Sequence, residues 1–137
     1  MWVADSRKRA RFTGILLIGY GIVGCIALLF FPMHLRGAEK SVSDIMHATL
    51  TGVIVLFILL YIGFGTTLHG KWFRLYSIWT ILILILFGTL AGLDGPRVAA
   101  QLPTPWLGIK ERINIYASML WVMVLAIKTL RTENAQD

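Results

Sequence analysis

Four long stretches that lack Asp, Glu, Lys and Arg limit this chain to very few folds. They cover residues 12–31, 45–64, 75–93 and 113–127. An α-helix rises about 1.5 Å per residue, so about 20 apolar residues are needed to cross a hydrocarbon layer about 30 Å thick. The first three stretches, of 20, 20 and 19 residues, meet this requirement directly. The fourth has 15 residues, but Arg112 and Lys128 at its ends extend it because their charged groups reach outward on apolar stems.

The pattern within these stretches predicts helices rather than β-strands. Membrane-spanning strands alternate apolar and polar residues, and the run Val53–Leu60 has no such alternation. The sequence therefore predicts an all-α integral membrane protein, with one membrane domain over residues 1–137 built as a four-transmembrane-helix bundle. We expect the helices at about residues 12–31, 44–65, 75–93 and 111–130, and a long loop over residues 94–110.

The composition excludes other classes of protein. The chain is 57% hydrophobic and 15% charged, whereas a soluble domain has about 45–50% apolar and about 25% charged residues. A soluble globular enzyme is therefore all but excluded. A disordered chain is excluded as well, because disorder requires many charges and few aromatic residues. Cys25 is the single cysteine, so no internal disulfide can form.

The first apolar stretch imitates three other motifs. Basic residues precede it as in a secretory signal, but it is longer than the usual apolar region of about 7–15 residues and no small-residue cleavage site follows. The segment Ile22–Cys25 resembles a lipoprotein lipidation site, yet residues 26–31 stay apolar where a mature lipoprotein turns polar. The segment Gly19–Gly24 spells G-x-G-x-x-G but lacks the preceding strand that a dinucleotide site requires. We interpret this stretch as a transmembrane helix with packing glycines.

The basic residues predict the orientation, because Lys and Arg concentrate on the cytoplasmic side of membrane proteins. With the N-terminus inside, eight basic residues are cytoplasmic: Arg7, Lys8, Arg9, Arg11, Lys71, Arg74, Lys128 and Arg131. Five lie outside: Arg36, Lys40, Arg97, Lys110 and Arg112. Both termini are therefore expected in the cytoplasm. The net charge of +6 indicates topology and contact with anionic lipids. It gives no support to nucleic-acid binding, since the basic residues form short flanks without a reading surface.

Polar residues recur at helical spacing on the second and fourth predicted helices. Asp44, His47 and Thr51 lie at positions i, i+3 and i+7, which places them on one helical face. The fourth helix repeats this spacing with Glu111, Asn114 and Ser118, and Trp121 follows one turn deeper. Polar groups in hydrocarbon usually face the protein interior and one another. We therefore expect the two stripes to converge at the outer side of the membrane.

This outer cluster is the best candidate site in the sequence. Its candidate ligand-binding residues are Arg36, Asp44, His47, Glu111, Arg112 and Asn114. Two interpretations stay open. The cluster either binds a ligand, lipid or ion, or it is purely structural, with the Ser41–Asp44 segment acting only as a helix-capping box. We expect Arg112 to pair with a carboxylate of another segment, so that Arg112→Ala destabilises the fold more than Lys110→Ala.

The histidines do not favour a cofactor. Helical bundles hold heme between histidines on facing helices, but His47 and His69 lie 22 residues apart along the second helix, about 33 Å at the standard rise. A pairing of His34 with His47 would need a ligand from a loop. Zinc could take these two with Asp44 or Glu111, yet no closely spaced histidine pair supports a metal site. The sequence indicates neither a cofactor nor a catalytic nucleophile.

Several segments resemble a known family of membrane proteins. They are Phe31–Gly37, Ser43–His47, Leu107–Tyr116 and Leu120–Val122. These segments are similar to the F-P-x-x-x-R-G, D-x-x-H and G-x-x-E-R-I motifs of bacterial and archaeal proteins grouped as domain of unknown function 998. The resemblance covers roughly residues 14–130 and implies a polytopic membrane fold without an established activity. The family-like positions are Arg36, Gly37, Asp44, His47, Glu111 and Arg112.

Members of that family usually carry two further helices before the four that this chain resembles. The resemblance therefore implies a short form, a truncated product, or a subunit that leans on partners. Our first hypothesis is an accessory or scaffolding subunit of a membrane assembly, with membrane lipids and other membrane subunits or further copies of the chain as partners. The alternative is a protein of the prokaryotic inner membrane that binds or modifies a lipid or small ligand with its outer cluster. Whether it catalyses a reaction is left open.

Overall fold

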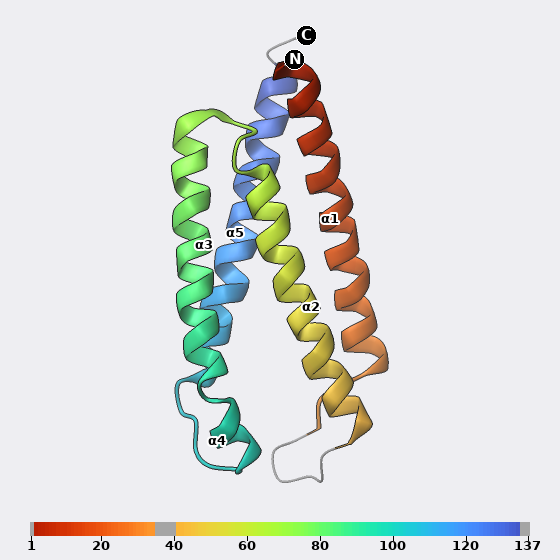
Figure 1. The fold of residues 1–137 in the computed structure, drawn as a ribbon, viewed down its shortest axis with the longest axis vertical. Helices are drawn as coiled ribbons and strands as arrows, with labels where there is room; N and C mark the ends of the chain where they lie inside the picture. Colours follow the sequence, from red (N-terminus) through yellow and green to blue (C-terminus); the bar gives the residue numbers. More distant parts are fainter. Residues whose placement is uncertain (1, 35–40, 135–137) are drawn as a thin grey trace. The chain divides into compact units, whose positions relative to one another are not determined.

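The computed structural model describes residues 2–34 and 41–134, with the backbone alone for residues 2–4. These residues form helices and no strand (Figure 1). The helices are α1 (Trp2–Phe30), α2 (Val42–Gly65), α3 (Gly70–Gly92), α4 (Gly95–Ala99) and α5 (Leu107–Asn134). The segments Asp5–Phe30, Val42–Gly65, Gly70–Ala99 and Leu107–Asn134 are each long and apolar enough to cross a membrane. The predicted all-α membrane protein with four spanning helices is thereby confirmed.

The chain divides into two compact units, residues 1–65 and residues 66–137. The first unit is an antiparallel hairpin of α1 and α2. The second is an antiparallel hairpin of α3 and α5, with the short helix α4 in the segment that connects them. Each hairpin holds its own set of candidate residues.

Contacts between aromatic rings and a glycine hold the first hairpin together. Gly19 of α1 faces Phe57 of α2 so closely that an added Cβ atom would lie 2.7 Å from the phenyl ring. Tyr20 and Tyr61 meet edge to face with their ring centroids 5.8 Å apart. Small residues let two helices approach closely in a membrane, where packing replaces the hydrophobic effect as the driving force. The glycine at position 19 is therefore a packing residue of the hairpin.

The second hairpin is centred on a buried indole. Trp121 of α5 is fully buried and donates a hydrogen bond of 2.8 Å from Nε1 to Oγ of Ser77 on α3. Its ring also packs against Phe73, with the centroids 5.5 Å apart. The hydroxyl of Ser77 donates in turn to the carbonyl of Phe73 at 2.8 Å. The indole N–H is thus satisfied inside the hairpin, as a buried donor must be where water is absent.

The helices are longer than their apolar stretches. α1 begins at Trp2 instead of residue 12, because Ala, Arg and Lys are good helix formers and continue the helix beyond the hydrocarbon layer. An ion pair of 3.4 Å between Asp5 and Arg9, one turn apart, supports this extension. α5 begins at Leu107 instead of residue 111, and residues 95–99 of the predicted loop form α4. The earlier start brings Lys110 into α5.

Candidate functional site

A capping box starts α2, as the sequence predicts. The backbone N–H of Asp44 donates to Oγ of Ser41 at 3.3 Å, and the backbone N–H of Ser41 donates to the Asp44 carboxylate at 2.9 Å. The Ser41 hydroxyl also donates to the same carboxylate at 3.0 Å. This reciprocal pattern satisfies N–H groups that have no partner within the helix. The contacts with Ser41 are therefore sufficient to hold the Asp44 side chain at the start of α2.

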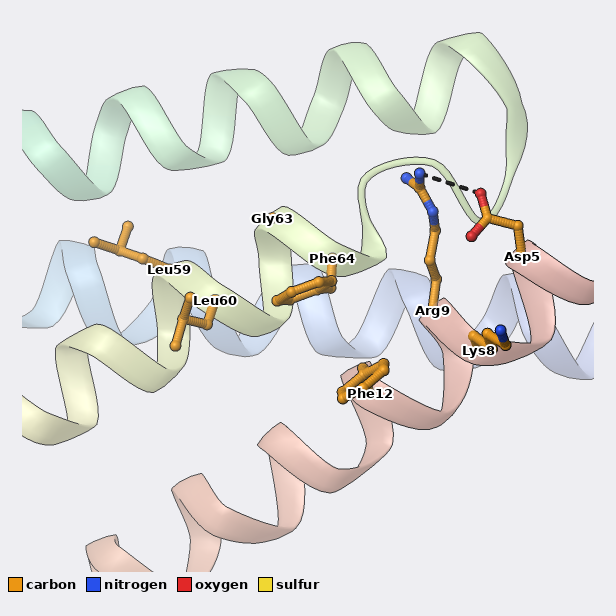
Figure 2. Close-up of a pocket in the computed structure, with 8 residues that line it drawn as sticks. All are labelled: Asp5, Lys8, Arg9, Phe12, Leu59, Leu60, Gly63 and Phe64. Atoms are coloured by element: carbon orange, nitrogen blue, oxygen red, sulfur yellow. Dashed lines mark hydrogen bonds and ion pairs between the residues drawn. The ribbon is translucent and has the colours of Figure 1, made fainter.

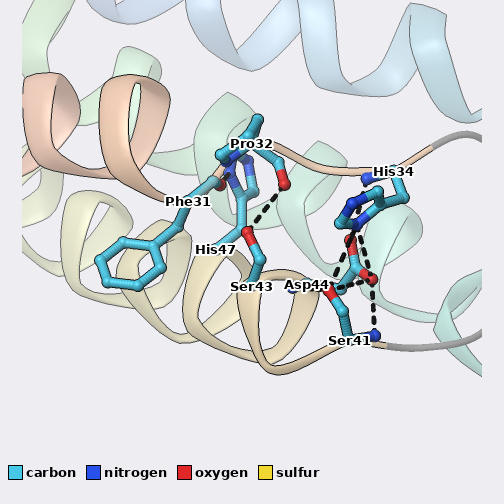
Figure 3. Close-up of polar contacts among 7 residues, drawn as sticks. All are labelled: Phe31, Pro32, His34, Ser41, Ser43, Asp44 and His47. Carbon is cyan, nitrogen blue, oxygen red and sulfur yellow. Dashed lines mark hydrogen bonds and ion pairs between the residues drawn. The ribbon is translucent and has the colours of Figure 1, made fainter.

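His34 completes this arrangement, and we call residues His34, Ser41 and Asp44 the His34–Asp44 cluster (Figure 3). The backbone N–H of His34 donates to Oδ1 of Asp44 at 2.9 Å, and its Nδ1 lies 3.2 Å from the same oxygen. The Ser41 hydroxyl lies 3.2 Å from Nδ1 as well. The His34 side chain stays 52% exposed, whereas that of Asp44 is only 16% exposed. The carboxylate is thus enclosed while the imidazole faces outward.

The chemistry of these partners favours one tautomer of the neutral His34 ring. A carboxylate only accepts hydrogen bonds, so Nδ1 carries the hydrogen in the neutral ring and Nε2 presents its lone pair. A carboxylate that orients a histidine through Nδ1 is the arrangement that makes Nε2 a proton acceptor in many sites. The serine of the cluster lies on the Nδ1 side of the ring and is therefore not placed as a nucleophile activated by Nε2. The cluster can therefore accept a hydrogen bond from a ligand at Nε2 of His34.

His47 and Ser43 fasten the segment that leads into this cluster. Nδ1 of His47 lies 2.7 Å from the carbonyl oxygen of Phe31, and Oγ of Ser43 donates to the carbonyl of Pro32 at 3.0 Å. Both bonds go to backbone carbonyls just after α1 ends, where no helical hydrogen bond satisfies them. Thr51, the third member of the predicted stripe, donates to the carbonyl of His47 within its own helix. The face that carries Asp44 and His47 therefore positions residues 31–34.

The predicted residues of α5 become more buried along the helix, from its start toward its middle. Ser118 is buried, Asn114 is partly buried, and Glu111 is exposed. The amide nitrogen of Asn114 lies 3.5 Å from the position that a Cβ atom would take on Gly88 of α3. Asn114, Ser118 and Trp121 thus line the side of α5 that packs on α3. Arg36 lies outside the described residues, and convergence of the two stripes stays a prediction because they belong to different units.

Lys110, and not Arg112, pairs with the carboxylate of Asp94, so the expected ion pair of Arg112 is not confirmed. Nζ of Lys110 lies 2.7 Å from Oδ2 of Asp94 and donates to the carbonyl of Leu90 at 3.2 Å. Within the described part of the chain, Arg112 pairs with no carboxylate. Arg112 lies two residues beyond Lys110, about 200° around the helix, and so points away from α3. The signal was present in the sequence, since Lys110 precedes Asn114 by four residues and shares its face.

His69 does not lie on the second helix with His47, as we expected, because α2 ends at Gly65 and α3 begins at Gly70. Its Nε2 lies 3.1 Å from Oγ1 of Thr129, and this contact joins the residue before α3 to the last turns of α5. The ring also meets Phe73 edge to face at 5.5 Å. Burial lowers the pKa of His69, and the nearby charge of Lys128 lowers it further. The neutral imidazole is therefore the form that the second hairpin stabilises.

The metal interpretation gains no geometric support. Among residues 2–34 and 41–134, no group of three His, Cys, Asp or Glu side chains is placed to hold a metal ion. His34 and His47 bond to different partners, a carboxylate and a backbone carbonyl, through the same ring nitrogen.

Comparison with known proteins identifies the family. A family model described as a protein of unknown function (DUF998) matches residues 1–128. The chain belongs to this family. The match extends the resemblance of the single motifs to nearly the whole chain, including the basic start of α1. No curated protein and no solved structure matches the chain. The DUF998 family is described without an activity, and the membrane-type helices of this chain agree with the polytopic family that its motifs resemble.

Proposed function

We propose that this DUF998 protein is an accessory subunit that packs against another transmembrane helix in a membrane assembly. The supporting observation is a face of α1 that the hairpin leaves uncovered. A Cβ atom added to Gly14, Gly21 or Gly24 would meet no atom within 4 Å. Gly19, which faces Phe57, lies about 140–160° around the helix from Gly14 and Gly21. These glycines are therefore not needed for packing α1 on α2.

The uncovered face has the residue spacing of a helix-packing motif. Gly21 and Cys25 are four residues apart, so they lie one above the other as two small residues separated by three. Cys25 is exposed, and so is Gly21. A flat glycine surface lets another helix approach closely and make van der Waals contacts. Lipid tails gain no comparable packing from it. By contrast, Gly88 on α3 is already used inside its own hairpin by Asn114.

The membrane and orientation form part of the proposal. We place the protein in the prokaryotic inner membrane with both termini in the cytoplasm, because eight of its 13 basic residues then lie inside. The partners are membrane lipids and other membrane subunits or further copies of the chain. A subunit of this kind needs no catalytic residue.

The test uses Gly21→Leu, with Gly52→Leu on α2 as the matched control. An added Cβ at Gly52 also meets no atom within 4 Å, so neither substitution places its Cβ against the hairpin. The chain is extracted from its native membrane in mild detergent, and its mass is measured by light scattering. We expect a particle larger than the 15.4 kDa monomer, reduced to a monomer by Gly21→Leu and unchanged by Gly52→Leu. A monomeric wild type, or a complex that tolerates Gly21→Leu, contradicts the proposal.

A second function rests on the His34–Asp44 cluster, whose exposed imidazole is oriented by an enclosed carboxylate. In the predicted orientation this cluster lies at the outer leaflet, where Nε2 of His34 would accept a hydrogen bond from the head group of a lipid or from a small ligand. Modification by diethyl pyrocarbonate measures this, because the reagent attacks an accessible nitrogen of neutral histidine. Native polar lipids should slow modification of His34 in micelles and leave His69 unaffected. Equal rates with and without lipid contradict this function.

A further inference from the structure

Two hollows lie at the end of the first hairpin where α1 begins and α2 ends, and Figure 2 shows the residues that line the larger one. The larger, about 480 Å³, is lined by residues that include Lys8, Phe12, Leu60, Gly63 and Phe64. The smaller, about 410 Å³, is lined by Lys8, Arg11, Phe12 and Ile15. Both hollows therefore share Lys8 and Phe12, and both lie within the first unit of the chain.

The walls of these hollows are mainly apolar. Phe12 and Phe64 stack with their ring centroids 5.8 Å apart and an interplanar angle of 23°. Beside them, Gly63 opens the wall of the larger hollow, because an added Cβ at this position would meet no atom within 4 Å. Leu59 and Leu60 continue the apolar wall along α2. An extended hydrocarbon chain matches such a surface in shape and polarity.

The mouth of the hollows is positively charged. Arg7, Lys8, Arg9 and Arg11 give the first turns of α1 four positive charges, against one negative charge from Asp5. Asp5 pairs with Arg9 at 3.4 Å. Lys8 and Arg11 are exposed and form no ion pair with any residue in the described ranges. The two cations that line the smaller hollow are therefore available to an anion.

Charge and apolar surface follow one another along a single helical face. Arg11, Phe12 and Ile15 lie three, four and seven residues after Lys8, which places all four on one side of α1. The seven residues from Lys8 to Ile15 span about 10 Å along the helix. A molecule bound along this length of helix extends from the level of the lipid head groups into the hydrocarbon layer.

We propose that this end of the hairpin binds one anionic diacyl phospholipid. Lys8 and Arg11 hold the phosphate, and the two acyl chains occupy the two hollows on either side of Phe12. Lys8 lines both hollows, so one phosphate bound at Lys8 can carry one acyl chain into each hollow. An anionic head group is favoured over a zwitterionic one, because the latter adds a positive charge beside Lys8 and Arg11. Lipids of this class are abundant on the side where basic flanks reside.

The experiment compares two lipids on the purified full chain by native mass spectrometry. The protein in detergent receives equal amounts of phosphatidylglycerol and phosphatidylcholine with matched acyl chains. Lys8→Gln tests the head-group contact, and Arg7→Gln is the matched control because it removes the same charge from a residue that lines neither hollow. Gly63→Leu fills the larger hollow. Gly52→Leu, eleven residues earlier on α2, adds the same side chain about 16 Å away.

We expect one tightly retained phosphatidylglycerol per chain and little phosphatidylcholine. Lys8→Gln should weaken retention about fivefold, the effect of one basic side chain at an anionic head group, whereas Arg7→Gln should change it less than about twofold. Gly63→Leu should weaken retention and Gly52→Leu should not. Equal retention of the two lipids, equal effects of Lys8→Gln and Arg7→Gln, or full retention by Gly63→Leu would each overturn the proposal. Circular dichroism of every variant confirms that the helices are intact.

Discussion

Replacing Lys110 by Met should separate a structural ion pair from an ordinary interfacial charge. The substitution keeps most of the side-chain volume and removes the ammonium that contacts Asp94 at 2.7 Å and the carbonyl of Leu90 at 3.2 Å. Arg112→Met is the matched control. It also removes one positive charge from α5, at a residue that pairs with no carboxylate in the described part of the chain.

The expected change in the free energy of unfolding follows from the burial of the ion pair. The side chains of Lys110 and Asp94 are 22% and 16% exposed. Removing one partner of a fully buried pair costs about 3–5 kcal/mol, and an exposed pair contributes about 0–1 kcal/mol. An enclosed pair with one additional carbonyl contact falls between these limits. We therefore expect Lys110→Met to lower the free energy of unfolding by about 1–3 kcal/mol, and Arg112→Met to lower it by less than about 0.5 kcal/mol.

The assay is reversible unfolding in mixed micelles, with the denaturing detergent increased stepwise and helix content followed by circular dichroism. Asp94→Asn and the double variant complete a double-mutant cycle. If the pair acts as the structure indicates, Lys110→Met costs much less in the Asp94→Asn background than in the wild type. Additive costs, or equal costs of Lys110→Met and Arg112→Met, would refute the assignment of this contact to Lys110.

Three further predictions concern contacts within the two hairpins. Trp121→Phe retains an aromatic ring but removes the hydrogen bond to Ser77. In the same assay, it should lower the free energy of unfolding by about 0.5–1.5 kcal/mol more in the wild type than in a Ser77→Ala background. The pKa of His69 is lowered in the folded state, so the free energy of unfolding should be constant above about pH 6.5 and fall as the pH drops below that value. His69→Gln should flatten this pH dependence. An unchanged pH dependence in the variant would exclude His69 as its source. Gly19→Leu should cost about 1–3 kcal/mol by overpacking against Phe57, and wild-type stability of this variant would show that the two helices do not meet there.

The sequence alone determined the class of the protein, its spanning helices and the start of α2. Hydropathy is a property of consecutive residues, so four uncharged stretches suffice to predict four apolar helices. The capping box of Ser41 and Asp44 is equally local, because its donors and acceptors lie within three residues of each other. The packing side of α5 was accessible too, since Asn114, Ser118 and Trp121 share one face by helical spacing alone.

Only the tertiary structure decided which polar groups meet. His34 and Asp44 lie ten residues apart, a separation at which helical spacing predicts no contact. Lys110, rather than Arg112, reaches Asp94 because α5 begins at Leu107 and packs on α3 with the face that Lys110 shares with Asn114. Two neighbouring cations are almost equivalent in a sequence. They differ by about 200° on a helix, and only the packing of that helix selects the one that finds a carboxylate.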